Sequence, residues 1–359
     1  MTLKQFIAVV LAASMASAPG TYAQPAARIP PRWIDVHLHL IGERGPRGDF
    51  AGAIASAIEA MDRFGIATAI VLPPPQIDEQ MRYDAPAFAA ALQRYRGRFA
   101  YLGGGGTLNS FIHRHADAST VSDAVKRQFA AAAEKLIDDG AVGFGEMASL
   151  HMSATARHPY EFVPADHPLF RVLADVAAKR DVPIDLHMDA VAGEMPTPAR
   201  FAVPPNPPKL ADTMAALARL LAYNRKARII WAHGGSDPLG AMSPAAIGRL
   251  MDANPNLFVS LRIVGPPAPM MNKALSNEGL DPDWRELLRR HVDRFVIGTD
   301  SFMVSPTMRG GGPGVRFAER NTPKLRATIH FLSLLPPGAA RRIGRDNALR
   351  IYRLRPGPA

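Results

Sequence analysis

Histidine and carboxylate side chains recur at the ends of apolar, strand-like runs in this sequence. His37 and His39 lie two residues apart at the end of the run WIDVHL. Side chains at this spacing on a β-strand share one face, so both imidazoles can approach one cation. Four later runs end in the further candidates Glu146, His187, His233 and Asp300. Imidazole and carboxylate without thiolate are typical ligands of Zn²⁺, with Mn²⁺, Fe²⁺ or Co²⁺ as alternatives, and we predict one or two ions.

These candidates can meet only if the strands that carry them are neighbours. Eight apolar runs rich in β-branched residues alternate with eight amphipathic, helix-like segments. The runs lie at residues 33–38, 67–73, 99–104, 141–147, 182–187, 227–233, 256–263 and 294–300. Continuous apolar runs are typical of buried parallel strands. The alternation predicts the α/β fold class and a (β/α)8 TIM barrel of the metal-dependent hydrolase type, in which the carboxyl ends of all strands meet at one mouth.

The alternative fold is a doubly wound open sheet, and it lacks its usual signal. No Gly-x-Gly-x-x-Gly follows the first run, although that motif marks dinucleotide-binding open sheets. Long connections follow the fourth, fifth and eighth runs, at residues 148–166, 188–209 and 301–321. We expect these to be active-site loops, because they leave the carboxyl ends of strands. The glycine-rich stretch at 102–110 is expected to be a flexible loop.

The first 23 residues are expected to be a secretory signal peptide. Lys4 precedes an apolar run from Phe6 to Ala13, and Thr-Tyr-Ala before Gln24 resembles a cleavage site. The alternative is an uncleaved anchor, but the run is short for a bilayer span. We therefore expect cleavage after Ala23, a periplasmic or secreted product without membrane attachment, and a single domain over residues 24–359. The absence of cysteine also excludes disulfides and a thiol nucleophile.

The formal net charge of +10 raises the question of a polyanionic partner. The basic residues are mostly arginines scattered through helix-like segments, without a dense basic run that contains aromatic residues. A nucleic-acid surface usually shows such clustering. We therefore expect a small-molecule substrate, which could carry a carboxylate, and no specific nucleic-acid partner. Barrels of this kind often form homodimers, but no segment of the sequence indicates a specific interface.

The ligand pattern resembles the amidohydrolase superfamily over Trp33–Arg353. The resemblance rests on Asp35-x-His37-x-His39, His187, His233 and Asp300. The segments IIWAHGG, NPNLFVSLR and GRDNALRIYRL are similar to the branch that holds aminocarboxymuconate-semialdehyde decarboxylase and the amidohydrolase-2 hydrolases. This resemblance implies a metal-dependent enzyme on a TIM barrel.

The sequence departs from binuclear relatives such as urease and dihydroorotase after the fourth run. Those enzymes carry a carboxylated lysine there, whereas this chain has Glu146, as in TatD-type nucleases. Two arrangements stay open. Glu146 could bridge two metal ions, or His37, His39 and His187 could hold one ion with Glu146 beside it. We slightly favour one tightly held ion.

The chemistry of each candidate then gives it an expected role. Asp300 is the expected general base for a metal-activated water, and His233 would orient the substrate carbonyl or ligate a second ion. Asp35 would support a ligand or pack near the barrel wall. Arg262, at the end of the seventh run, could bind a substrate carboxylate or pair with a loop carboxylate.

Two further groups of residues are candidates by their position in the sequence. His151 and Tyr160, with His158 nearby, lie in the expected loop after the fourth run and are candidates for contact with substrate. His113 and His115 form a second His-x-His pair, but it follows a glycine-rich stretch and not an apolar strand. We therefore do not expect this second pair to bind metal.

We predict an exported hydrolase of an amide, lactone or ester-like bond. The same residues could instead support non-oxidative decarboxylation of an aromatic or enoic acid. A TatD-like nuclease is a second alternative, indicated by Glu146 and the positive charge. A non-catalytic metal-binding protein is the third, but it would have no need of Asp300 beside the metal.

Overall fold

The computed structural model describes residues 32–42, 48–75, 77, 83–95, 97–153, 158–203, 205–308 and 318–355. The expected signal peptide at residues 1–23 lies outside these ranges, as do parts of the loops at 154–157 and 309–317. Within the described ranges, no helix is both long and apolar enough to cross a membrane.

Parallel strands form the centre of the molecule in two sheets. The first sheet has the order β15 (Ser301–Val304), β1 (Trp33–Ile41), β2 (Ile66–Val71), β3 (Phe99–Tyr101). The second has the order β14 (Phe295–Ile297), β11 (Leu257–Leu261), β10 (Arg228–Gly234), β7 (Pro183–Met188), β5 (Phe144–His151), β4 (Gly103–Gly104). Each strand follows its neighbour in chain order, as a TIM barrel requires.

Two broken strands join the sheets into the predicted (β/α)8 barrel. Leu102 alone separates β3 from β4, and its N–H donates to the Val71 carbonyl oxygen at 2.9 Å. Residues 298–300 separate β14 from β15, and here the Asp300 N–H donates to the His37 carbonyl oxygen at 2.9 Å. The third and eighth strands therefore pass from one sheet to the other, and the hydrogen-bonded ladder is interrupted at these two places.

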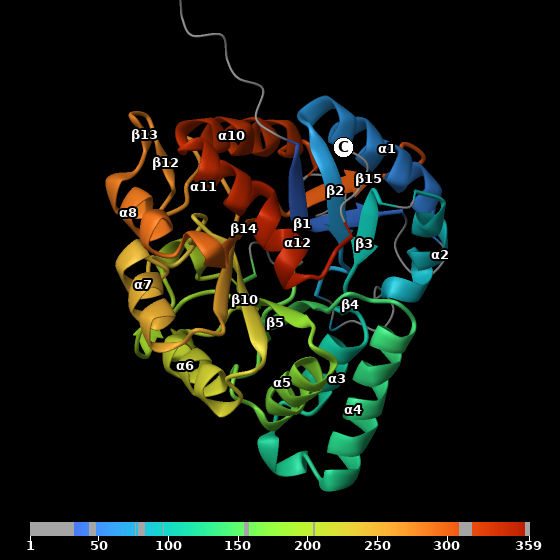
Figure 1. Ribbon diagram of the computed structural model, residues 1–359. Helices are drawn as coiled ribbons and strands as arrows, with labels where there is room; N and C mark the ends of the chain where they lie inside the picture. The colour runs from blue at the N-terminus through green and yellow to red at the C-terminus, as the bar shows by residue number, and fades with distance from the viewer. Residues whose placement is uncertain are drawn as a thin grey trace, which may run out of the picture.

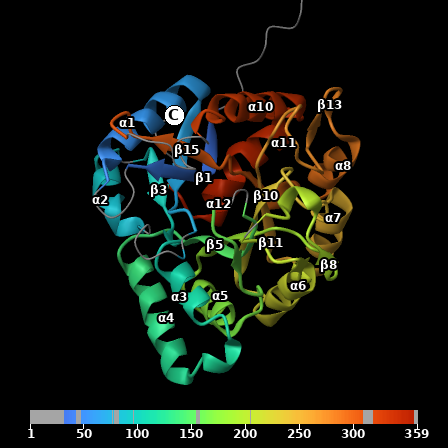
Figure 2. The ribbon, with the colours of Figure 1, turned by 180° about the vertical axis from the view of Figure 1, so that it is seen from behind.

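Helices surround the strands on all sides, as Figure 1 and the reverse view in Figure 2 show. The longer helices are α1 (Phe50–Phe64), α3 (Leu108–Arg114), α4 (Asp123–Asp138), α5 (Pro168–Arg180), α6 (Thr213–Tyr223), α7 (Pro244–Ala253), α8 (Pro282–Arg290) and α10 (Asn321–Leu334). Shorter helices are α2 (Ala89–Leu92), α11 (Pro337–Arg341) and α12 (Asn347–Ile351). Side chains at helix starts fix several boundaries. Ser122, Asp212 and Ser243 each accept a main-chain N–H of the first turn.

An apolar cluster fills the barrel between the strands. Its members include Ile34, Val36, Ile70, Leu72, Leu102, Ile230, Phe258 and Val296, with Ile351 and Tyr352 from the C-terminal segment. Their side chains remove apolar surface from water, which stabilises the strand arrangement. A second cluster packs the outer strand faces against the helices. The strand residues that carry polar groups are therefore held in a rigid frame.

The structure differs from the sequence expectations in the connections. Strand β5 continues to His151, so residues 148–151 are strand and not loop, and Glu146 is its third residue. β6 (Glu161–Phe162) pairs antiparallel with its end. β8 (Met195–Pro196) and β9 (Lys209–Leu210) form a hairpin in the second connection. The third connection begins with β15, and the glycine-rich stretch leads directly into α3. Local pattern alone missed these short pairings, which depend on contacts between distant segments.

Candidate metal centre

The structure brings all six predicted ligand residues together in one buried cluster. His37 and His39 come from β1, Glu146 from β5, His187 from β7, His233 from β10, and Asp300 from the break between β14 and β15. Each of them is less than 9% exposed. Burying so many ionisable groups is costly unless they compensate one another or hold a cation.

Glu146 is at the centre of this cluster. Its Oε2 lies 3.5 Å from His37 Nε2 and 3.4 Å from His39 Nε2. Its Oε1 lies 2.7 Å from His187 Nδ1 and 3.2 Å from His233 Nε2. Burial alone would raise the pKa of Glu146, but the surrounding histidines hold this pKa well below its usual range. The carboxylate is therefore ionised and points both oxygens at imidazole nitrogens.

His39 shows most clearly that these nitrogens suit a metal. In the neutral ring its Nδ1–H donates to the Leu72 carbonyl oxygen at 2.9 Å and its Nε2 carries the lone pair. Burial opposes a charged ring, but the Asp300 and Glu146 carboxylates raise the pKa of His39, so they favour positive charge at Nε2. That Nε2 is buried without a hydrogen-bond partner, 3.4 Å from Glu146 Oε2 and 3.4 Å from Asp300 Oδ1. A lone pair facing two carboxylate oxygens is unfavourable unless a cation lies among them. The donor set therefore fits a divalent metal ion.

Two groups of three side chains have ligand atoms within 4.8 Å of one another. One is His37, His39 and Asp300, and the other is His37, Glu146 and His233. The Nε2 of His37 and the Nδ1 of His233 are also buried without hydrogen-bond partners. His187 belongs to neither group and joins the cluster through Glu146 and through His233 Nε2, which lies 3.0 Å from its Nδ1. In this structure Asp300 and not His187 completes a group with the two histidines of β1.

Asp300 lies between this cluster and two cations. Its Oδ2 is 3.1 Å from Arg262 Nη1, and the Lys324 ammonium donates to its main-chain oxygen. Burial alone would raise the pKa of Asp300, but Arg262 and Lys324 hold this pKa well below its usual range. Asp300 therefore stays ionised beside the histidines. Arg262 therefore pairs with a carboxylate of the centre itself and not with a loop carboxylate.

Two aspartates that the sequence analysis did not select support the histidines. Asp185 lies 3.3 Å from His37 Nδ1, and Asp189 Oδ1 lies 3.7 Å from His187 Nε2. A carboxylate behind a ligating imidazole fixes its orientation and raises its basicity. The spacing offered a signal, because Asp185 and Asp189 flank His187 at two residues on either side along one strand face.

Asp35 supports the strand break that carries Asp300. It accepts hydrogen bonds from the Thr299 N–H at 2.9 Å and the His37 N–H at 3.1 Å, and from the Thr299 hydroxyl. The residue is fully buried. The two expected roles were support of a ligand and packing near the barrel wall. The hydrogen bonds of Asp35 agree with the first, because they hold the backbone next to His37 and Asp300.

The expected substrate residues have different surroundings. The His151 ring lies 4.3 Å from the His187 ring and 4.6 Å from the His158 ring, which places both beside the centre. Tyr160 is half-buried, and its ring lies 6.5 Å from that of Phe162. His113 lies on α3, where its Nε2 is 3.3 Å from the Ala148 carbonyl oxygen. Neither His113 nor His115 belongs to a metal-ligand group among the described residues.

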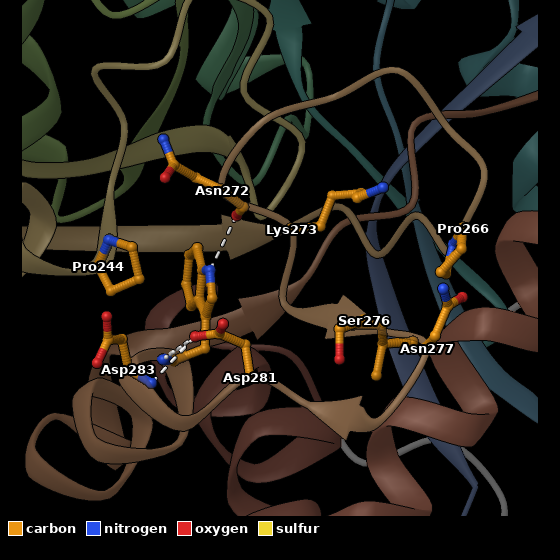
Figure 3. A pocket seen from close by; sticks show the side chains of 10 residues that line it. Pro244, Pro266, Asn272, Lys273, Ser276, Asn277, Asp281 and Asp283 are labelled. Atoms are coloured by element: carbon orange, nitrogen blue, oxygen red, sulfur yellow. Dashed lines mark hydrogen bonds between the residues drawn. The ribbon is translucent and has the colours of Figure 1, made fainter.

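A separate hollow lies beside α8, lined by Pro244 and by residues between 266 and 284 (Figure 3). Two of its polar side chains already form hydrogen bonds to main-chain groups of the fold. The Lys273 ammonium donates to the Ala268 carbonyl oxygen at 3.0 Å, and Asp281 accepts main-chain N–H groups at the start of α8. None of the six ligand residues lines this hollow, so it is distinct from the metal centre.

Comparisons with known proteins agree with this geometry. The family described as Amidohydrolase matches residues 113–354, whereas no curated protein matches the chain. A Staphylococcus aureus protein assigned to the amidohydrolases aligns with a TM-score of 0.50 and 13% identity, over 90% of this chain and 99% of that one. A 2,6-dihydroxybenzoate decarboxylase from Rhizobium aligns with a TM-score of 0.50 and 14% identity, over the same shares. At these identities the two structures support the shared fold.

The family match covers more than half of the chain and includes the strands that carry Glu146, His187, His233 and Asp300. It confirms the resemblance drawn from the sequence, including its amidohydrolase-2 branch. The chain is an enzyme of the amidohydrolase family.

Proposed function

We propose that this enzyme is a metal-dependent hydrolase of an amide, lactone or ester-like bond in a small molecule. The observation that carries the proposal is the buried Nε2 of His39, which lacks a hydrogen-bond partner and faces the carboxylates of Glu146 and Asp300. A buried polar atom normally has a hydrogen-bond partner. A purely structural role for His39 would therefore not explain why its Nε2 has none.

His37, His39, Glu146 and Asp300 would hold the ion, with His233 and His187 on the far side of Glu146. Both compact ligand groups use His37, whose Nδ1 is turned toward Asp185. One tightly held ion is therefore our first choice, with a second ion between Glu146 and His233 as the alternative. When bound, a divalent ion supplies a Lewis acid that polarises a carbonyl and lowers the pKa of a water. Zn²⁺ is our first choice, and Mn²⁺, Fe²⁺ and Co²⁺ are the alternatives.

The residues of the chain would carry the proton transfers. Asp300 is ionised and would take the proton of the attacking water and later give it to the leaving group. Burial lowers the pKa of His233 to about 3, so its imidazole is neutral and would contact the substrate carbonyl as a hydrogen-bond partner. Arg262 would keep Asp300 oriented through their 3.1 Å contact until substrate binds.

The substrate side of the site combines a guanidinium with neutral imidazoles. Burial lowers the pKa of His151 and of His158, so both rings are neutral near pH 7. Arg262 Nε is buried without a hydrogen-bond partner and could bind a substrate carboxylate. We therefore propose an acidic small molecule, with His151 at its side and Tyr160 farther out in the same connection.

Decarboxylation is the second candidate function. The specific observation is that Arg262 lies beside Asp300, which places a carboxylate-binding group next to a residue that can transfer a proton. In that reaction Arg262 would hold the substrate carboxylate. Asp300 would first take a proton from a water molecule and would then deliver it to the carbon that loses carbon dioxide. The nuclease and the metal-carrier alternatives have no comparable observation in their favour.

One experiment separates these functions. The chain is purified without chelators, supplied with Zn²⁺, Mn²⁺ or Co²⁺, and assayed against amides, lactones, aromatic acids and single-stranded DNA. Hydrolysis with metal that stops in the Asp300→Asn variant supports the proposal. Release of carbon dioxide from aromatic acids, with no hydrolysis, would replace it with decarboxylation. Metal binding with no turnover on any class would favour a carrier.

Export is a separate proposal, which rests on the first 23 residues alone. The chain is expressed in a Gram-negative host, and the periplasmic fraction is examined by N-terminal sequencing. A mature protein that begins at Gln24 supports cleavage after Ala23. Recovery of the uncut chain from the cytoplasm would contradict it.

A further inference from the structure

Lys324 is a buried lysine that the proposed function does not use. It lies on α10 and is 7% exposed. Burying an ammonium group costs free energy unless it gains partners. The structure gives it two: its Nζ donates to the main-chain oxygen of Asp300 and lies 5.9 Å from the centre of the Phe302 ring. Both partners belong to the segment at the β14–β15 break, which carries Asp300 into the metal centre.

The backbone of Asp300 needs such a partner. Asp300 has a φ of +53°, in the left-handed region that residues other than glycine seldom adopt. It lies at the break between β14 and β15, where the regular ladder stops. Its N–H donates to the His37 carbonyl oxygen, and its own carbonyl oxygen accepts from Lys324. His37 and Lys324 therefore bind the main-chain N–H and the main-chain carbonyl oxygen of Asp300, respectively.

The first turn of α10 makes a second contact with the segment that follows Asp300. The Asn321 side chain accepts from the Phe302 N–H at 3.1 Å and donates to the Phe302 carbonyl oxygen at 2.7 Å. Asn321 thus fixes the strand after the break, whereas Lys324 holds Asp300 itself. The backbone of Asp300 in turn directs its Oδ1 to within 3.4 Å of His39 Nε2.

We propose that Lys324 is a positioning residue, whose ammonium holds the Asp300 peptide so that the Asp300 carboxylate faces the free nitrogen of His39. The proposal rests on the proposed function, because it gives Asp300 a place in the metal centre. Lys324 acts through Asp300.

The test is Co²⁺ binding by the full chain, read as a dissociation constant and as the visible absorption spectrum of the bound ion. Lys324→Met removes the ammonium and keeps the length of the side chain. Support from outside the ligand set is typically worth about 10- to 100-fold in metal affinity. We therefore expect Lys324→Met to weaken Co²⁺ binding by about that factor and to change the spectrum. Lys324→Arg should restore most of both.

Lys273→Met is the matched control. The Lys273 ammonium also donates to a main-chain carbonyl oxygen, that of Ala268, but away from the centre. It should bind Co²⁺ as the wild type does. If Lys324→Met does not fold, Lys324→Gln replaces it, with the same expected direction.

Wild-type affinity and spectrum in a folded Lys324→Met or Lys324→Gln protein would overturn the positioning role. Equal weakening in Lys324→Met and Lys273→Met would also overturn it, because the effect would then be general destabilisation. A wild-type chain that binds no Co²⁺, Zn²⁺ or Mn²⁺ would contradict the proposed function itself. The two failures are therefore distinguishable.

Discussion

Two buried glutamates have pKa values shifted in opposite directions: Glu146 lies on the barrel strand β5, and Glu161 lies on the short strand β6 that pairs with the end of β5. Glu146 on β5 is 3% exposed and has four imidazole nitrogens within 3.5 Å, which hold its pKa well below the usual range. Glu161 on β6 is 1% exposed and accepts one hydrogen bond, from Asn109 Nδ2 at 2.9 Å. Burial raises the pKa of Glu161 to about 7.

The difference shows that burial alone does not make a functional carboxylate. Desolvation opposes the charged form of both residues by a similar mechanism. Glu146 lies among four imidazole nitrogens that together outweigh its desolvation. At Glu161 the Asn109 amide and the more distant His187 offset the desolvation only in part. The imidazoles around Glu146 are also groups that can bind a metal when they are deprotonated. Glu161 is held by packing and by one amide, so its ionised form is poorly stabilised. We therefore assign Glu146 to the metal centre and Glu161 to the fold.

The largest expected effect is the loss of metal affinity in Glu146→Gln. An amide cannot supply the negative charge that faces the four imidazoles, so affinity for Zn²⁺ should fall by more than about 100-fold, beyond what supporting residues contribute. Glu161→Gln should bind Zn²⁺ as the wild type does. Isothermal titration calorimetry measures both. Equal affinities in the two variants would remove the distinction between the two glutamates.

A second effect concerns Asp300, a third buried carboxylate, which is flanked by cations. Asp300 is the proposed general base, and a general base usually contributes about 10²- to 10⁴-fold to the rate. Replacement of Asp300 by Asn should therefore lower kcat by about that factor. The variant should bind the ion more weakly, because the amide lacks the negative charge, but it should still take up the ion supplied in excess, because the Asn oxygen can act as a ligand. Steady-state kinetics on the substrate found by screening, with metal analysis of the same sample, checks this. Full activity in Asp300→Asn would exclude it as the base.

The smallest effect is on the pH dependence of stability. An unfolded glutamate has a pKa of about 4.3, below the value of about 7 for Glu161 in the folded state. Between these values the folded protein keeps a proton that the unfolded chain releases. The Glu161 contribution to the free energy of unfolding therefore falls as the pH rises from about 4.3 to 7, by at most about 1.4 kcal/mol per pH unit, and then stays constant.

Glu161→Gln should remove that contribution, so the variant should gain stability relative to the wild type as the pH rises through this window. Urea unfolding at several pH values measures the difference. Glu134→Gln is the control, because Lys179 and Arg180 hold the pKa of Glu134 below its usual range. Its difference from the wild type should not change between pH 5 and 7. A parallel trend in both variants would contradict the assignment.

The sequence was sufficient to predict the barrel and the histidines and carboxylates that meet at its mouth, because both follow from local pattern. Alternating apolar runs and helical segments predicted the strands, and the strand ends gave His37, His39, His187 and His233. The position of Glu146 inside β5, and not at its end, could not be predicted, since a strand boundary depends on pairing with β6. The β14–β15 break was likewise hidden, because it depends on side chains from β1.

The supporting residues were harder to predict for a different physical reason. Lys324 lies 24 residues after Asp300 and reaches it only because α10 packs against the end of β15. The spacing of Asp185 and His187 indicates a shared strand face, but it does not indicate that β1 places His37 beside Asp185. Such contacts depend on tertiary packing, which no spacing rule in a single sequence contains.

The most direct test of the metal centre is elemental analysis of the chain purified without chelators or a metal-binding tag. The wild type is compared with the His37→Ala/His39→Ala double variant and with His113→Ala/His115→Ala, which removes the other His-x-His pair. We predict about one equivalent of a divalent ion, or two, in the wild type and in the His113/His115 variant, and almost none when His37 and His39 are replaced. No bound metal in the wild type, and none after addition of Zn²⁺ or Mn²⁺, would contradict the proposed centre.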